Sequence, residues 1–413
     1  MKAKKLVDKR KLILKEILMG FLLTSLSSVA LAETNSSQIY INEQAPTTLN
    51  IDEAKDIAAF YLVELSETIP KLSEWGNAVV KPDITFYDVD GNITAYSFDV
   101  MKNNQYDGYI ITSATKDKYP VLEFSKGELP TENSTMTKKS QCEAAKYANK
   151  NKLSVGKSIP IYDGATFYYN EYDLRDNKNT TKDKVIVDLI TSKIISEDTE
   201  NLSSSTDKAE TTDIKEIKEA WNNLENRMTR ESNGLEILVT ATATSKDISG
   251  VPYYNASYIG CAPAAGAMVL GYWDSNGYSN LPSGNTLMSE LATAMGTYQY
   301  STNTDMIDDG IETVCSNHGY TNFNAIKYSS TMYMSHVVSE INANRPFVLC
   351  MVSGGARIGS SSAYGNHGVT CMGYYYQGTT QYLNLHDGWD TSAAHYITYG
   401  NWGKATTPIW VRP

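Results

Sequence analysis

The segment Tyr258-Ile-Gly-Cys-Ala-Pro-Ala-Ala-Gly-Ala-Met-Val-Leu-Gly-Tyr-Trp-Asp274 carries the strongest local signal in the chain. Pro263 is favoured in the first turn of a helix and excluded from its interior, and the small and apolar residues after it have helical periodicity. The pattern predicts a buried helix with Cys261 at its amino-terminal end. Free N–H groups and the helix dipole stabilise a thiolate there and can also receive an oxyanion. Cys261 is therefore the candidate nucleophile.

A nucleophilic cysteine needs a base, and the chain has five histidines. His367 lies in Tyr364-Gly-Asn-His-Gly-Val-Thr-Cys-Met-Gly-Tyr374, where a loop with flanking glycines leads into a predicted strand. His318 precedes Gly319 at a predicted helix end, and His336 lies within a predicted helix, so both are interpreted as surface or capping residues. His367 is therefore the candidate general base.

The base in turn needs a group that fixes its orientation. The stretch Tyr382-Leu-Asn-Leu-His-Asp-Gly-Trp-Asp390 is predicted to be a strand that ends in polar residues. Asp387 is expected to accept the imidazole N–H of His367. Asn384 is an alternative, although strand alternation directs it to the opposite face. Four side chains could instead gather around a metal ion, although their spacing matches no defined zinc or calcium motif: His386, Asp387, Asp390 and His395.

This order of a cysteine at a helix start, a histidine on a strand and an aspartate one strand later resembles the papain-like cysteine peptidases. The details look most like the branch related to bacteriocin-processing, double-glycine leader peptidases. The resemblance covers about residues 250 to 413 and implies an α+β papain-like domain with a helical half (261 to 345) and an antiparallel sheet (346 to 413). The motifs that carry it are Val251-Pro-Tyr-Tyr, Gly260-Cys-Ala-Pro-Ala-Ala-Gly-Ala-Met, His367-Gly-Val-Thr and His386-Asp-Gly-Trp.

The same resemblance implies a Cys261, His367 and Asp387 mechanism, a peptide or protein substrate and no cofactor. The family usually has Gln six residues before the nucleophile as an oxyanion donor, and the chain has Asn255 at that position. Asn keeps the amide N–H₂ but is one methylene shorter. It can act as the oxyanion donor only if the backbone at Asn255 lies closer to the oxyanion than a Gln backbone would.

The first half of the chain is predicted to form a separate, smaller α+β unit. Asn50 and Glu53 stand in capping-box positions before an amphipathic helix to Leu65. Two β-rich runs flank Asp90-Gly-Asn92, which is typical of a hairpin turn. Further strands are expected at 109–113, 120–124, 165–169 and 185–190, and a further helix at 141–152. The stretches Asp107-Gly-Tyr-Ile-Ile-Thr-Ser and Tyr119-Pro-Val-Leu-Glu-Phe-Ser resemble inhibitory prosegments of streptopain-like bacterial proteases, which implies that this unit is an intramolecular inhibitor.

The ends and linkers suggest export and processing. Residues 1–32 have a basic start, an apolar run and Ala30-Leu-Ala32, a pattern typical of a cleaved signal peptide. An uncleaved anchor is the alternative, but the run is short and interrupted by serines. We therefore expect a secreted or cell-envelope protein without stable membrane insertion. Residues 33–200 would be the propeptide, 201–247 a linker and helix with the processing site, and 248–413 the peptidase domain.

The net charge and the cysteine content limit the possible partners and disulfides of the chain. The net charge of −11 argues against a nucleic-acid partner. Five cysteines without a CxxC spacing predict at least one free thiol, and three of them, Cys315, Cys350 and Cys371, are expected in the core. Two other functions stay open at this point. One is a cell-wall amidase or transpeptidase on the same fold, and the other is an inactive papain-like surface-binding protein.

Overall fold

The computed structural model describes residues 47–195, 214–232, 244–352, 366–389, 391, 394–402 and 405–413. The predicted signal peptide and, within the predicted linker and processing region, residues 201–213 and 233–243 lie outside these residues. Within them, no helix has the length and apolar character needed to cross a bilayer.

Residues 47–195, here called the amino-terminal unit, begin with the predicted capped helix. Asn50 Oδ1 accepts the N–H groups of Asp52 and Glu53 at 2.9 and 3.0 Å, and the Glu53 carboxylate accepts the Asn50 N–H at 2.9 Å. This capping box satisfies N–H groups that lack intrahelical partners. The elements of the first part are α2 (Ile51–Thr68), η1 (Pro70–Asn77), β1 (Val79–Tyr87), β2 (Ile93–Lys102), β3 (Gln105–Ser113) and β4 (Val121–Ser125).

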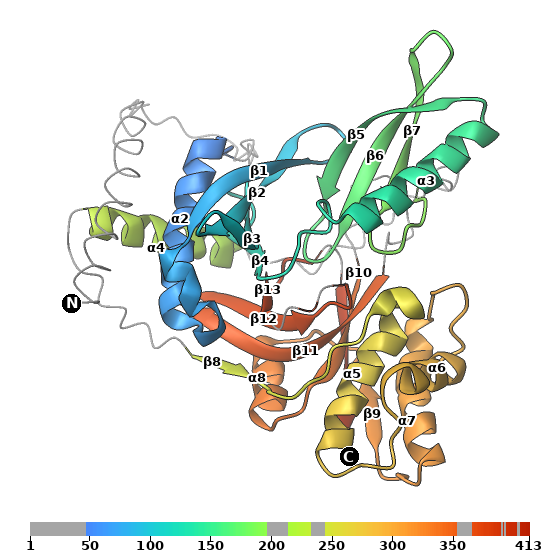
Figure 1. Cartoon of the computed structure of the whole chain (residues 1–413). Coiled ribbons are helices and arrows are strands. Elements are labelled where there is room, and N and C mark those ends of the chain that lie inside the picture. The colour runs from blue at the N-terminus through green and yellow to red at the C-terminus, as the bar shows by residue number, and fades with distance from the viewer. Residues whose placement is uncertain are drawn as a thin grey trace, which may run out of the picture.

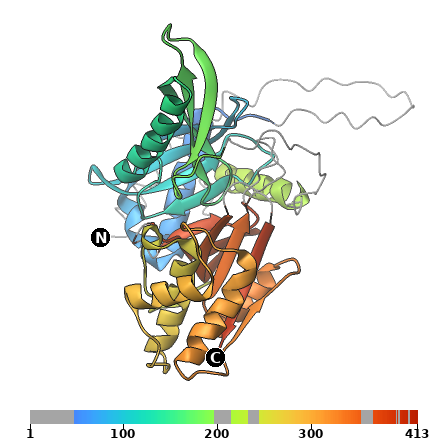
Figure 2. The ribbon, with the colours of Figure 1, turned by 90° about the vertical axis from the view of Figure 1, so that its right-hand side faces the viewer.

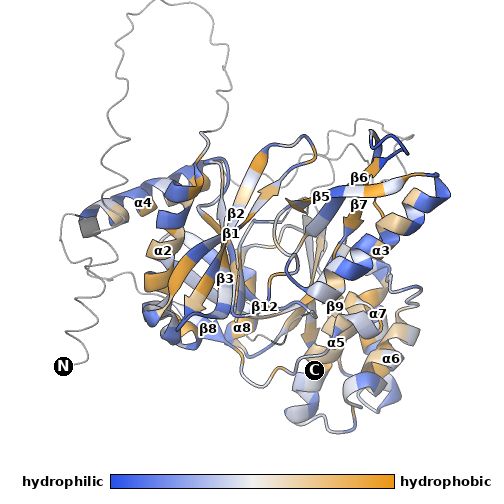
Figure 3. Cartoon of the chain, turned by 45° about the horizontal axis from the view of Figure 1, so that its top comes forward, coloured by the Kyte–Doolittle hydropathy of each residue, from blue (hydrophilic) through white to orange (hydrophobic). Residues whose placement is uncertain are grey.

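The second part of this unit departs in detail from the predicted elements. It contains α3 (Ser134–Lys150), β5 (Ser154–Tyr162), β6 (Tyr168–Arg175) and β7 (Thr181–Asp188). The helix expected at 141–152 is present but begins earlier. Strand β5 was not predicted, because Gly156 and Pro160 both disfavour a strand interior. The strand expected at 165–169 begins only at Tyr168. The tip of the β6–β7 hairpin is strongly hydrophilic, as Figure 3 shows.

Residues 244–413, here called the carboxy-terminal unit, have helices first and an antiparallel sheet afterwards, as predicted. Helices α5, α6 and α7 lie together at one side of the sheet (Figures 1 and 2). The mixed α+β class is therefore confirmed. The elements are β8 (Ser245–Asp247), η2 (Ala256–Tyr258), α5 (Cys261–Ser275), α6 (Gly284–Ala294), η3 (Thr304–Met306), α7 (Ile307–Asn317), β9 (Asn324–Lys327), α8 (Met334–Asn342), β10 (Phe347–Val352), β11 (Asn366–Gln377), β12 (Thr380–His386), β13 (His395–Thr398) and β14 (Ala405–Arg412).

The strands of both units join into one sheet. Its order is β7-β6-β5-β1-β2-β3-β4-β13-β12-β11-β10-β14-β9, with β8 paired to β11. The junction is the antiparallel pair β4–β13, in which Ile397 lies opposite Glu123 and His395 opposite Ser125. The Phe124 and Tyr396 rings stack across it at 5.1 Å. The sequence patterns did not predict this pairing, since they specify strands and not their partners.

Helix α4 (Ile214–Ser232) lies beside α2 (Figure 1) and is attached to it through a buried ion pair. Arg227 Nη1 lies 2.5 and 2.6 Å from the two carboxylate oxygens of Glu64, and the Arg227 guanidinium lies 5.4 Å from the centre of the Phe60 ring. Gln377 of β11 also donates to Glu64. One carboxylate therefore connects α2, α4 and the carboxy-terminal sheet.

Replacing Arg227 by Met should lower the free energy of unfolding by about 3 kcal/mol, because it leaves the buried Glu64 carboxylate without its cation. Urea unfolding followed by circular dichroism measures this loss. Lys215→Ala on the same helix is the control. Lys215 forms an exposed pair with Glu219, so this change should cost less than about 0.5 kcal/mol. Equal losses in the two variants would contradict the role given to Glu64.

Candidate active site

Cys261 is the first residue of α5, as predicted. Gly260 precedes it with φ of 113°, a conformation that favours glycine. A Cβ atom at Gly260 would lie 2.7 Å from the Tyr300 carbonyl oxygen, so the close approach of that loop also requires glycine. The helix behind Cys261 is buried from Ala262 to Tyr272. The nucleophile is thus fixed on a rigid helix while its own side chain stays partly exposed.

His367 comes to Cys261 because β11 passes directly across the start of α5. A Cβ atom at Gly368 would lie only 3.3 Å from the Ala262 Cα. His367 is 4% exposed, and its side chain lies close enough to Cys261 to lower the pKa of the thiol. Its Nε2 contacts the Asp387 carbonyl oxygen at 3.0 Å, which leaves Nδ1 as the nitrogen available to the sulfur. The first two residues of the predicted triad are therefore in contact.

The electrostatics of this pair favour a thiolate and an imidazolium. Burial by itself raises the pKa of the Cys261 thiol, but the hydrogen bond and charge of His367 and backbone hydrogen bonds from Gly368 and Ala262 outweigh it, so the pKa is lowered. Burial lowers the pKa of His367, but the interaction with Cys261 and the charges of Asp387 and Asp188 raise it above its ordinary value. Each partner stabilises the charged form of the other.

Asp387 hydrogen-bonds to His367 through its main-chain carbonyl, while its carboxylate charge acts on the same imidazole. The carbonyl oxygen accepts the Nε2–H, whereas carboxylate Oδ2 lies 2.6 Å from His395 Nδ1 and Oδ1 accepts the Trp389 N–H at 2.9 Å. The Trp389 ring stacks on the His367 ring at 5.1 Å. The expected contact between Asp387 and His367 is therefore present, but its acceptor is the main-chain carbonyl and not the carboxylate, and the orienting role stays a prediction.

The other residues considered near Asp387 have separate partners. Asn384 donates to Asp247 at 2.9 Å, so it points away from His367. His386 Nε2 lies 3.4 Å from the Val251 carbonyl oxygen. Asp390 lies outside the described residues. Asp387 and His395 contact each other directly, and the four-residue metal group considered from the sequence is not among the possible metal-holding groups of the described residues.

Comparisons with known proteins agree with this geometry. Residues 248–411, less than half of the chain, match the Peptidase_C39 like family. This carboxy-terminal segment is similar to that family of cysteine peptidases. The branch that processes double-glycine leaders stays a prediction.

The comparisons beyond the family match are weaker. Among solved structures, a prointerpain A fragment from Prevotella intermedia is 14% identical and covers 81% of this chain and 98% of its own, with a TM-score of 0.34. No curated protein matches the chain.

Asn255 lies beside the catalytic loop of the peptidase domain. The N–H of the next residue, Ala256, donates to the Gly388 carbonyl at 2.8 Å. The Asn255 side-chain oxygen accepts the Ser257 N–H at 2.8 Å and caps η2. The amide oxygen is therefore occupied, while the amide N–H₂ is the group that an oxyanion would need. Its role as an oxyanion donor stays a prediction.

The other four cysteines are also free thiols, and the charge of Cys261 acts on one of them, Cys350. Cys315, Cys350 and Cys371 are buried, as predicted, and burial raises the pKa of the first two to about 12 and that of Cys371 still further. Cys142 is exposed on α3. Cys261 is the one cysteine of the chain whose pKa is shifted downward.

Two acidic residues of the amino-terminal unit reach the peptidase site, and sequence reasoning missed both. The buried Asp188 at the end of β7 acts electrostatically on His367. Glu123 of β4 contacts His395 Nε2 at 2.7 Å. A charge inside the apolar run Pro120-Val-Leu-Glu-Phe124 was the available signal for Glu123, because a buried strand rarely keeps an unpaired carboxylate.

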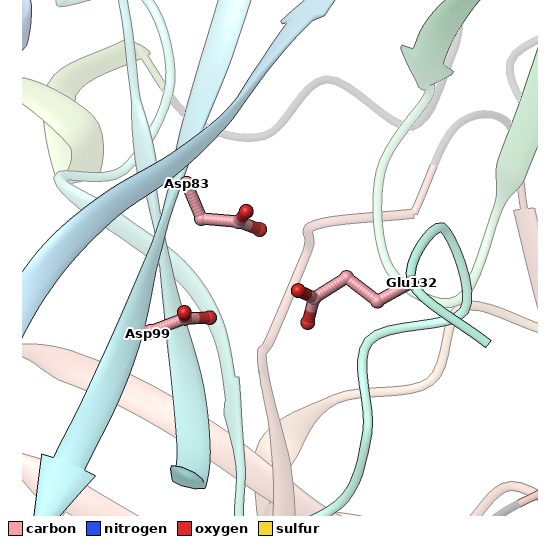
Figure 4. A group of neighbouring side chains, drawn as sticks. All are labelled: Asp83, Asp99 and Glu132. Carbon is pink, nitrogen blue, oxygen red and sulfur yellow. The ribbon is translucent and has the colours of Figure 1, made fainter. Parts of the chain in front are cut away.

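A separate acidic group lies in the amino-terminal unit. Asp83 of β1, Asp99 of β2 and Glu132 point toward one another (Figure 4), and a carboxylate oxygen from each lies within 4.8 Å of the others. Burial and the repulsion of Asp83, Asp99 and Glu128 raise the pKa of Glu132 to about 7. The group could hold a cation geometrically, but without one its members repel each other.

Replacing His367 by Ala should slow alkylation of Cys261 by iodoacetamide near pH 6.5 by about tenfold or more. Without the imidazole, burial dominates and raises the thiol pKa, so the reactive thiolate fraction below the ordinary thiol pKa falls. Peptide mass spectrometry after timed alkylation gives the rate at Cys261 separately from that at Cys142. His318→Ala, which removes a histidine paired with Glu290, is the control and should leave the rate unchanged.

The acidic group predicts a pH-dependent stability. The folded-state pKa of Glu132 lies above its unfolded value, so the folded chain binds the proton more tightly and loses stability as pH rises from about 4.5 to about 7. Glu132→Gln should therefore raise the free energy of unfolding at pH 8 and change it little at pH 4. Urea titrations at both values test this. Asp90→Asn, in the exposed hairpin turn, controls for the loss of one charge.

Proposed function

We propose that the chain is a secreted cysteine peptidase that is made as an inactive precursor and hydrolyses peptide bonds through Cys261 and His367. The observation that carries this proposal is the pairing of Cys261 at the start of α5 with His367 on β11, in which each side chain shifts the pKa of the other toward its charged form. The family match over residues 248–411 supports the same chemistry. The expected substrate is a protein or peptide, and no step of this mechanism requires a cofactor.

The catalytic cycle follows from the charge state of the pair. The Cys261 thiolate attacks the carbonyl carbon of the scissile bond, and N–H groups at the start of α5 stabilise the oxyanion. The His367 imidazolium protonates the leaving amine. Water then attacks the thioester with His367 as the base, which regenerates the thiol. Asp387 orients the imidazole, and Asn255 would supply a second oxyanion donor.

The position of the amino-terminal unit supports its role as an inhibitory propeptide. Its Tyr168 ring contacts Trp389 edge to face at 6.5 Å, and Trp389 in turn stacks on His367. The Ala165 N–H donates to the Asn401 carbonyl at 2.5 Å. These contacts cover the site from the side of the sheet junction, so substrate access would require this unit to move or to be removed by cleavage within 201–247.

Hydrolysis of a quenched fluorescent peptide library by the exported protein tests the proposal. Cys261→Ala should abolish hydrolysis, because no other group in the site replaces the nucleophile. Cys142→Ser is the matched control, since it removes an exposed thiol outside the site and should retain full activity. Equal hydrolysis by the parent and Cys261→Ala would contradict the assignment.

The precursor hypothesis is tested by following the mass of the exported chain together with its activity. Activity should appear only with loss of the amino-terminal unit. An active chain that stays uncut would contradict the inhibitory role. Cys261-dependent release of cell-wall amides without peptide hydrolysis would instead favour the amidase alternative.

A further inference from the structure

His395 is buried between two carboxylates that come from different units of the chain. Its Nδ1 lies 2.6 Å from Asp387 Oδ2, and its Nε2 lies 2.7 Å from Glu123 Oε1. The side chains of His395 and Glu123 are 0% exposed and that of Asp387 is 1% exposed. Asp387 belongs to the catalytic loop, and Glu123 belongs to β4 of the amino-terminal unit. The imidazole therefore bridges the unit that would be removed and the loop that contacts His367.

Glu123 has several hydrogen-bond partners within the amino-terminal unit. Its carboxylate accepts hydrogen bonds from Tyr109 at 2.8 Å, Tyr168 at 2.5 Å and Tyr162 at 2.9 Å, all of which belong to the amino-terminal unit. The Thr166 N–H adds a weaker contact at 3.4 Å. If this unit separates, Glu123 keeps these partners, whereas His395 loses one of its two carboxylates and gains contact with water.

The charges at the bridge favour an imidazolium. Burial alone would lower the pKa of His395, but Glu123 and Asp387 raise it well above its ordinary value. Burial raises the pKa of Glu123, but the charge of His395 and the hydrogen bonds from His395 and the tyrosines lower it. The other groups that face the bridge are the Tyr109 ring at 6.5 Å and the Trp389 ring at 6.0 Å from the His395 ring. His367, with Asp188 acting on it, lies beyond Asp387.

We propose that Glu123 and His395 are positioning residues that hold the Asp387 carboxylate away from His367 while the amino-terminal unit is in place. Asp387 is then released to the catalytic imidazole when that unit leaves. This inference rests on the proposed peptidase function and extends it to the control of the site.

The contacts of Asp387 explain why the hold is reversible. Its main chain already accepts the His367 Nε2–H at 3.0 Å, so its carboxylate needs only a side-chain rotation to approach the same ring. A carboxylate that lies between two imidazoles pairs with the imidazole that holds its proton more tightly. With Glu123 in place, that ring is His395. Without Glu123, His395 can release its proton to water, and its attraction for Asp387 falls.

The protonation state of His395 is the direct test. The uncut chain with Cys261→Ala, labelled with ¹⁵N-histidine, is titrated by NMR, and the His395 signal is assigned by its loss in His395→Gln. His395 should stay doubly protonated well above the pH at which an ordinary imidazole loses its proton. Glu123→Gln should lower its titration midpoint by about one pH unit or more, a tenfold loss of proton affinity. Glu132→Gln, which removes a carboxylate from the same unit away from the bridge, is the control and should leave the midpoint unchanged.

The positioning claim needs a second readout at His367. In Glu123→Gln the released Asp387 carboxylate should raise the titration midpoint of His367, and adding Asp387→Asn should cancel that rise. A His395 midpoint unaffected by Glu123→Gln overturns the proposal, as does a His395 shift with no change at His367. If Glu123→Gln does not fold, Glu123→Asp is the second variant. It keeps a charge for the tyrosines, but its side chain is one methylene shorter and contacts His395 less closely. It should shift both midpoints in the same directions.

The Cys261→Ala background keeps this test separate from the peptidase proposal. That chain cannot form a thioester, so its histidine titrations do not depend on turnover. Loss of the peptidase assignment in the library assay would leave the titration result standing, and a negative titration would leave the Cys261-dependent hydrolysis standing.

Discussion

The interaction between Cys261 and His367 is the one on which the proposed function of this molecule depends. It requires a helix that starts at the sulfur and a strand that crosses that start closely enough for the imidazole to reach it. Gly260 and Gly368 permit the two close approaches, one to the Tyr300 loop and one to Ala262. Because His367 is buried and Cys261 is only partly exposed, each charge is stabilised largely by the other. The reactivity of the thiol is thus a property of the packing between α5 and β11.

The same site is coupled to the amino-terminal unit through backbone and charge together. Strand β4 pairs with β13, so the strand that carries His395 is ordered by a segment more than two hundred residues earlier in the chain. Glu123 on β4 then contacts His395 directly. A removable unit that shares a sheet with the catalytic part can influence the active site without occupying the position of the substrate. It acts on the residue that orients the general base.

Short-range patterns anticipated much of this structure. The capping box at Asn50, the helix start at Cys261 and the strand after His367 were all predicted, because each depends on residues within one or two turns of the position concerned. Strand β5 escaped prediction because its Gly156 and Pro160 disfavour the conformation that the neighbouring strands impose. The roles of Glu123 and Asp188 escaped because their partners lie far away in the chain.

The sequence by itself determined the local positions of the residues proposed to carry the chemistry, since a cysteine at a helix start and a histidine at a strand start are specified by local backbone preferences and residue type. Only the tertiary structure decided which atoms meet. It placed the Asp387 carbonyl on His367 and the Asp387 carboxylate on His395, and it joined β4 to β13. The physical reason is that a buried carboxylate pairs with the cation that holds its charge most strongly. Which cation that is depends here on residues from both units of the chain.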